Sequence, residues 1–141
     1  MKFSEIDSNV QDKIVDMLNN HIAATANILK QDRHLIPMLM IPDTKQLVSL
    51  QSIDGTIDVD GAYAAVINKL RNEDFTYALF SYSSKIGLVN GKVIDALKTY
   101  IFTKDGLEVS FYTPFEVKGI FKKVINVEKS MLAEIKENIF E

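Results

Sequence analysis

LKTYIFTKDGLEVSFYT, residues 97–113, places two runs rich in β-branched and aromatic side chains on either side of an Asp-Gly pair at 105–106. Asp-Gly is favoured in a two-residue type I′ hairpin loop, which needs positive φ at both central positions. A loop of that length places Phe102 opposite Val109, so that the two share a face. Because a slip of one residue would exchange the faces, turn and pattern together predict a β-hairpin in this register.

A second hairpin is predicted by Asn-Gly at 90–91. Closed without bulges, it places Phe80 opposite Ile101, in agreement with the faces deduced from the first hairpin. Residues 75–82 are apolar on both faces, which is typical of a central strand. The two turns therefore predict a three-stranded antiparallel meander.

Three helices are predicted from apolar stripes that repeat at helical spacing. The longest covers residues 8–30, with Asp7 or Ser8 as its N-cap. Its stripe consists of Val10, Ile14, Met17, Leu18, Ile22, Thr25, Ile28 and Leu29. A second helix ends at about Arg71, and a third begins at about Glu128. The stripe of the third consists of Met131, Leu132, Ile135 and Ile139.

Two further strands are predicted at 35–41 and 46–50, around a type I turn with Pro42 at its second position. Pro37 cannot donate to a ladder, which predicts that the first of them lies at a sheet edge or a bulge. The order α-β-β-α-β-β-β-α predicts a single two-layer α+β domain over residues 1–141. Its sheet is mainly antiparallel, with about five strands packed on a long N-terminal helix. The crossover into the third strand stays open between a parallel and an antiparallel connection.

Composition narrows the function classes. The chain is 47% hydrophobic and 25% charged, with a formal net charge of -3, which argues against a dedicated nucleic-acid binder. There is no cysteine, so disulfides, thiolate catalysis and iron–sulfur clusters are excluded. The first residues lack the apolar core of a signal peptide, and no run is long enough to span a membrane. We therefore expect a cytoplasmic protein without a membrane partner.

The acidic stretch Asp54, Asp58 and Asp60 is the only cluster suited to a hard cation. Aligned to a calcium-binding loop, it has Thr56 as its first ligand and Ile67 where a bidentate glutamate belongs. The match fails at both ends, so we expect Asp58 or Asp60 to cap the following helix instead. The sequence thus predicts neither a metal nor another cofactor.

The sequence contains no recognisable catalytic motif. His21 lies on the apolar stripe of the first helix, which is typical of a packed histidine with one hydrogen-bonded nitrogen, and His34 falls in a solvated loop. The serines of SYSSK, residues 81–85, belong to no nucleophile motif, and no histidine is predicted nearby. An enzyme is therefore the less favoured class.

One predicted sheet face is unusually apolar. In the register deduced above it carries Phe80, Tyr82, Thr99, Ile101, Ser110 and Tyr112. A face that met only water would be more polar, so either a helix of the protein covers it or it binds a partner. For the second case we predict four contact residues: Phe80, Tyr82, Ile101 and Tyr112.

The preferred hypothesis is a non-catalytic protein that associates with a copy of itself, as a homodimer or larger homo-oligomer, or with another protein. Bacterial accessory, phage-encoded and toxin-neutralising proteins are often of this size and architecture, which is an analogy of fold only. The alternative is a small-ligand-binding or metal-assisted enzyme that uses Asp54, Asp58 and Asp60 with His34.

Overall fold

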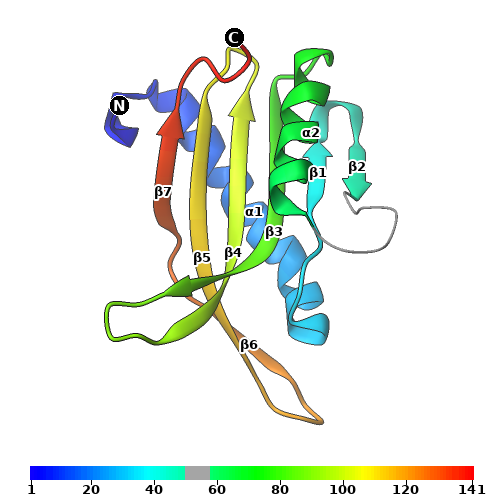
Figure 1. Ribbon diagram of the computed structural model, residues 1–141, viewed down its shortest axis with the longest axis vertical. Helices are drawn as coiled ribbons and strands as arrows, with labels where there is room; N and C mark the ends of the chain where they lie inside the picture. Colours follow the sequence, from blue (N-terminus) through cyan, green and yellow to red (C-terminus); the bar gives the residue numbers. More distant parts are fainter. Residues whose placement is uncertain (50–57) are drawn as a thin grey trace.

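Figure 1 shows the computed structural model of the protein, which describes residues 1–49 and 58–141. Helices and strands follow one another in a mixed order along the chain. They are η1 (Phe3–Glu5), α1 (Ser8–Asp32), β1 (Met38–Ile41), η2 (Pro42–Thr44), β2 (Gln46–Ser49), α2 (Val59–Arg71), β3 (Tyr77–Gly87), β4 (Val93–Thr103), β5 (Glu108–Lys118), β6 (Val124–Val127) and β7 (Met131–Lys136). The fold is α+β with an antiparallel sheet, as the sequence predicts.

The sheet has the strand order β2-β1-β3-β4-β5, and both β6 and β7 pair with β5. Every neighbouring pair is antiparallel. β2 and β3 therefore run in the same direction with β1 between them, and α2 connects them across β1. The prediction of an edge strand after Pro37 is wrong, because the proline precedes the ladder and β1 lies between two partners.

The hairpin at residues 97–113 forms, but its predicted register is wrong by one residue. The N–H of Thr103 donates to the carbonyl of Leu107, and the N–H of Gly106 donates to the carbonyl of Thr103. This pattern is that of a three-residue loop with glycine in the left-handed region, where Gly106 has φ 94°. Asp105 keeps a negative φ, so the type I′ turn does not form. Val109 consequently pairs with Ile101 rather than with Phe102.

The second hairpin has the same kind of loop. The N–H of Leu88 donates to the carbonyl of Lys92, and Gly91 has φ 82°. Phe80 therefore lies opposite Tyr100 and not opposite Ile101. The three-stranded meander is confirmed, and β3 is central to the sheet, but both registers move by one residue.

The predicted C-terminal helix is wrong, since residues 131–136 form β7 along the edge of β5. Leu132 pairs with Phe111 and Ile135 with Val109, and the register shifts between these pairs at a bulge. A bulge adds one residue to a strand, so apolar residues three apart come to lie on the same face. That spacing is also the spacing of a helix, which explains the error.

Apolar cores lie on both faces of the sheet rather than between two layers. α1 packs through Ile14 and Leu18 on the face that carries Leu79, and α2 packs through Val66 on the face that carries Phe80. Leu79 and Phe80 are neighbours on β3, so their side chains point to opposite faces. Figure 1 shows α1 behind the sheet and α2 in front of it.

α1 begins at Ser8, as the sequence predicts. The carboxylate of Asp7 accepts hydrogen bonds from the backbone N–H groups of Asn9 and Val10, at 3.1 and 3.3 Å, and so caps α1. Within the described residues, neither helix combines the length and the apolar character that crossing a membrane requires.

Candidate functional site

A group of tyrosines lies on the α2 side of the sheet, next to the helix. Tyr82 on β3, Lys98 on β4 and Tyr112 on β5 are register partners in a row across three strands. Tyr100 follows Lys98 by two residues and therefore points to the same face. All three tyrosines are half-buried, so their rings are part of the surface. We call Tyr82, Tyr100, Tyr112 and Lys98 the tyrosine surface.

The rings of this surface are held by stacking. Tyr100 stacks on Phe80, with ring centroids 5.6 Å apart, and on Phe102, at 6.2 Å. Tyr63 of α2 lies against the ring of Tyr100 at 5.3 Å. The hydroxyl groups of Tyr82 and Tyr100 are 3.4 Å apart. Aromatic contacts of this kind hold the rings of Tyr82 and Tyr100 in place before any partner binds.

Lys98 is the unusual member, because only 7% of this charged residue is exposed. Its Nζ lies 3.9 Å from the ring centre of Tyr112 and 5.2 Å from that of Tyr100, which are cation–π contacts. With the described residues its ammonium group forms neither an ion pair nor a hydrogen bond. The three donors of the group are therefore not used by the fold.

Glu108 lies further along the same face and is fully buried. The hydroxyl of Tyr63 donates a hydrogen bond to its Oε1, while its Oε2 has no partner among the described residues. Burial raises the pKa of the Glu108 carboxyl, and the bond from Tyr63 and the charges of Lys136 and Lys98 lower it in part. Burial, followed by the bond to Glu108, raises the pKa of Tyr63 above its ordinary value.

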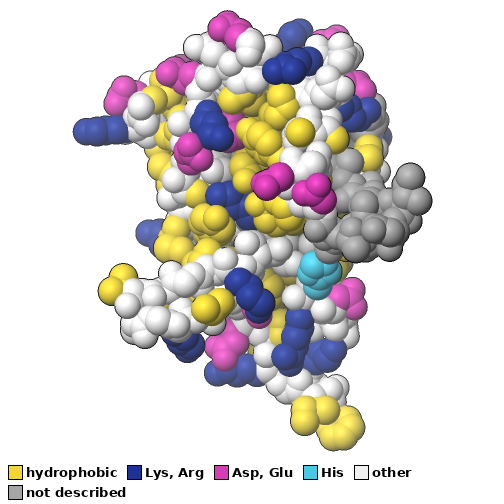
Figure 2. Space-filling view, in the orientation of Figure 1, with side chains coloured by type: hydrophobic (Ala, Val, Ile, Leu, Met, Phe, Trp, Pro, Cys, Tyr) yellow, Lys and Arg dark blue, Asp and Glu magenta, His cyan; other side chains and the backbone are white. Residues whose placement is uncertain are grey.

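Figure 2 shows the α2 side of the molecule as a surface. Hydrophobic side chains gather in front of the central strands beside α2, with acidic and basic groups set among them. This side is thus neither uniformly polar nor uniformly apolar. Mixed surfaces of this kind, rich in tyrosine, are typical of the contact regions of proteins.

The structure brings only part of the predicted contact set together. Tyr82 and Tyr112 lie on the tyrosine surface, half-exposed. Phe80 is on the same face but fully buried beneath α2, and Ile101 is fully buried on the opposite face, against α1. Sequence reasoning missed Lys98 and Tyr100, because the one-residue register error assigned the even-numbered residues of β4 to the wrong face.

Both histidines contact serines of β3, which the sequence did not predict. His21 is buried and its Nε2 lies 2.8 Å from Oγ of Ser81. Its Nδ1 has no partner in the described structure, so the prediction of a packed histidine with one bonded nitrogen is confirmed. Burial lowers the pKa of His21 to about 4.

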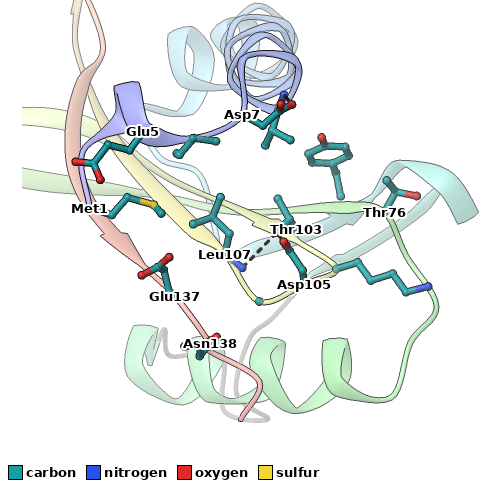
Figure 3. Close-up of a pocket in the computed structure, with 14 residues that line it drawn as sticks. Met1, Glu5, Asp7, Thr76, Thr103, Asp105, Leu107, Glu137 and Asn138 are labelled. Carbon is teal, nitrogen blue, oxygen red and sulfur yellow. Dashed lines mark hydrogen bonds between the residues drawn. The ribbon is translucent and has the colours of Figure 1, made fainter.

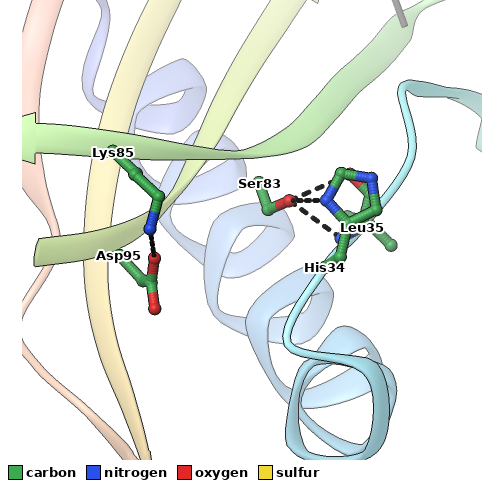
Figure 4. A network of polar contacts seen from close by, with 5 residues as sticks. All are labelled: His34, Leu35, Ser83, Lys85 and Asp95. Atoms are coloured by element: carbon green, nitrogen blue, oxygen red, sulfur yellow. Dashed lines mark hydrogen bonds and ion pairs between the residues drawn. The ribbon is translucent and has the colours of Figure 1, made fainter. Parts of the chain in front are cut away.

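The second pair joins His34 and Ser83, with Nδ1 and Oγ 2.8 Å apart (Figure 4). The same Oγ accepts a bond of 2.9 Å from the backbone N–H of Leu35 and lies 3.3 Å from its carbonyl. Lys85 and Asp95 form a separate ion pair of 2.7 Å nearby. Ser83 thus attaches the segment after α1 to β3, and its hydroxyl is occupied by backbone groups.

The acidic stretch does not gather into a metal centre in the described residues. Oδ1 of Asp58 accepts a bond of 3.1 Å from the backbone N–H of Gly61, so Asp58 caps α2. Asp60 follows in the first turn of α2, and Asp54 lies outside the described residues. Across residues 1–49 and 58–141, no three histidine or acidic side chains are placed to share a metal ion.

A groove of about 690 Å³ opens at the end of the sheet, between the N-terminal residues and the 103–107 turn (Figure 3). Its acidic side chains are mostly engaged locally. Glu5 accepts from the backbone of Lys2, Asp7 caps α1, and Asp105 accepts from the hydroxyl of Thr103. These bonds account for the carboxylates of Glu5, Asp7 and Asp105 without a ligand.

Comparisons with protein-family models, curated proteins and solved structures found no match to this chain. Any functional interpretation therefore rests on the residues and their geometry.

Proposed function

We propose that the protein is a non-catalytic interaction protein that associates through the tyrosine surface. The observation that supports this most directly is the row of Tyr82, Lys98 and Tyr112 across three strands, half-exposed at its two ends. Tyrosine is enriched in the contact regions of proteins because it combines a large apolar ring with a polar group. The ring of Tyr82 contacts Phe80, and that of Tyr100 contacts Phe80 and Tyr63, so little conformational freedom of these two rings is lost when a partner binds.

The partner that we propose is a second copy of the chain, so that the protein is a homo-oligomer. The cytoplasm is the compartment that we propose for it, because the chain contains no cysteine and needs no oxidising environment. The small-ligand or metal-assisted enzyme receives less support, since Asp58 is engaged as the cap of α2 and the hydroxyl of Ser83 is held by backbone.

Solution mass tests this proposal. Light scattering over a concentration series should give an oligomer of the 15.9 kDa chain that the double substitution Tyr82→Ala and Tyr112→Ala converts to monomer. Circular dichroism of the same variant should show an intact fold, because both side chains are half-exposed. Removing two interface tyrosines typically weakens association by about 2 kcal/mol or more.

Phe121→Ala is the matched control, because Phe121 is a fully exposed aromatic residue at the turn between β5 and β6, away from the tyrosine surface. We expect this variant to keep the mass of the wild type. A wild-type protein that stays monomeric at every concentration would contradict self-association. An oligomer that Phe121→Ala dissolves and the tyrosine variant does not would move the interface to that turn.

A further inference from the structure

Lys98 is a buried charged residue whose ammonium group has no counter-ion among the described residues. The residue is more than nine-tenths buried, yet within the described structure its Nζ lies over the rings of Tyr112 and Tyr100 and has neither an ion pair nor a hydrogen bond. Removing a charge from water without pairing it costs free energy, and a cation–π contact offsets only part of that cost. An anion that reached Nζ would gain three unused donors in a site already largely screened from water.

The surroundings of Lys98 indicate which anion fits. Its register partners are Tyr82 and Tyr112, so tyrosine rings flank it on both neighbouring strands. Glu108 lies on the same face and the charge of Lys98 acts on its carboxyl, but no ion pair or hydrogen bond joins the two groups: its Oε1 accepts from Tyr63 and its Oε2 has no partner among the described residues. A single ammonium between aromatic walls suits a singly charged, planar group, whereas phosphate sites usually combine several donors or cations.

We propose that Lys98 binds a carboxylate, from an aspartate or glutamate side chain of the protein that docks on the tyrosine surface. This inference rests on the proposed function and specifies the chemistry of its contact. The carboxylate accepts hydrogen bonds from Nζ of Lys98, and the apolar part of the same segment lies on the rings of Tyr82 and Tyr112. The chain has 19 acidic residues, so a second copy can supply the group.

Phenylacetate is a suitable probe, because it joins one carboxylate to one aromatic ring. In a side-chain NMR titration we expect saturable shifts of the Lys98 ε-methylene and Tyr112 ring signals, with a dissociation constant on the order of 1–10 mM for so small a ligand. Benzyl alcohol, which keeps the ring without the charge, should give at most a small fraction of those shifts. Inorganic phosphate should bind at least several-fold more weakly than phenylacetate.

Two variants assign the effect to Lys98. Lys98→Met keeps an apolar stem and should abolish the Tyr112 shifts, while Lys98→Arg keeps a cation and should retain binding. Lys85→Met is the matched control, because Lys85 is an exposed lysine on the neighbouring strand β3. Equal shifts with benzyl alcohol, tighter binding of phosphate, or unchanged titrations in Lys98→Met would each overturn the carboxylate site.

Measurements of self-association distinguish this inference from the proposed function. If both are right, Lys98→Met should weaken self-association about 10- to 100-fold, as loss of a close charge pair at an interface does. If Tyr82→Ala with Tyr112→Ala dissolves the oligomer and Lys98→Met leaves it intact, the interface stands and the carboxylate contact is wrong. If phenylacetate binds at Lys98 but the protein is monomeric, the site stands and self-association is wrong.

Discussion

His21 makes the stability of this fold depend on pH in a direction that the structure determines. The imidazole is buried between α1 and β3, bonded to Ser81, and its pKa is lowered to about 4 by burial. In the unfolded chain the ordinary value of 6.5 applies. As the pH falls below 6.5, the unfolded chain binds a proton that the folded protein resists, so the free energy of unfolding falls.

The size of the effect follows from the two pKa values. Between about pH 8 and pH 5 the imidazole should remove about 2 kcal/mol from the free energy of unfolding, and about 3 kcal/mol once the pH is well below 4. Most of the loss occurs between pH 6.5 and pH 4, where only the unfolded chain is protonated. Such a loss is a large part of the stability of an ordinary domain.

Urea denaturation followed by circular dichroism, repeated from about pH 8 to pH 5, measures this quantity. His21→Gln preserves a hydrogen-bonding group for Ser81 but cannot be protonated, so its unfolding free energy should be flatter with pH than that of the wild type by about 2 kcal/mol. Glu108 makes an opposite contribution, because its raised pKa gives stability that is present at low pH and lost as the pH rises through its pKa in the folded protein. Both proteins contain Glu108, so this contribution cancels in the comparison with wild type.

His34→Gln is the control for a histidine that is exposed, and it should follow the wild-type curve. Parallel pH profiles for wild type and His21→Gln would show that His21 is not held neutral by burial, and the argument would fail. If His34→Gln flattened the pH dependence of the unfolding free energy by the same amount, the effect would not be specific to His21.

Two further predictions concern the sheet. Glu108→Gln should raise the melting temperature at about pH 8, because glutamine can still accept the bond from Tyr63 without a buried charge. The control Glu116→Gln, on the exposed end of β5, should change the melting temperature little. A lower melting temperature for Glu108→Gln would contradict the reasoning. Gly106→Ala and Gly91→Ala both force alanine into the left-handed region, at about 1 kcal/mol or more each. Of these two glycines, only Gly106 has neighbours for the added Cβ, with Asn138 Cα and Ile139 N at 3.4 Å. Gly106→Ala should therefore lower the unfolding free energy in urea by more than Gly91→Ala. Equal losses of unfolding free energy would show that this contact is unimportant.

Helices and strands were predicted well wherever a long stripe or a strong turn marks them. α1 begins and ends within two residues of the predicted 8–30, and both Asx-Gly pairs lie in hairpin turns. The pairs do not determine the length of the loop, because glycine supplies the positive φ in a three-residue loop as well as in a two-residue one. Each register therefore moved by one residue, although the pattern and the turn had agreed.

The same residue shift explains what was missed at the candidate site. Tyr82 and Tyr112 are half-exposed, so both stay candidates for partner contact, but Ile101 was assigned to their face and Lys98 and Tyr100 were not. With a three-residue loop in each hairpin, the even-numbered residues of β4 join Tyr82 and Tyr112. The alternation of Lys98, Tyr100 and Phe102 was visible in the sequence, and only the loop length was needed to place it.

The bulge in the pairing of β5 with β7 has a consequence for the behaviour of the protein at high concentration. A flat, regular outer strand is a template on which further chains can add and grow into fibrils. β7 is irregular opposite Ser110 and Phe111, and it carries Glu134 and Lys136, whose charges resist a neutral zipper of strands. The border of the sheet that adjoins the tyrosine surface is thus protected against open-ended polymerisation.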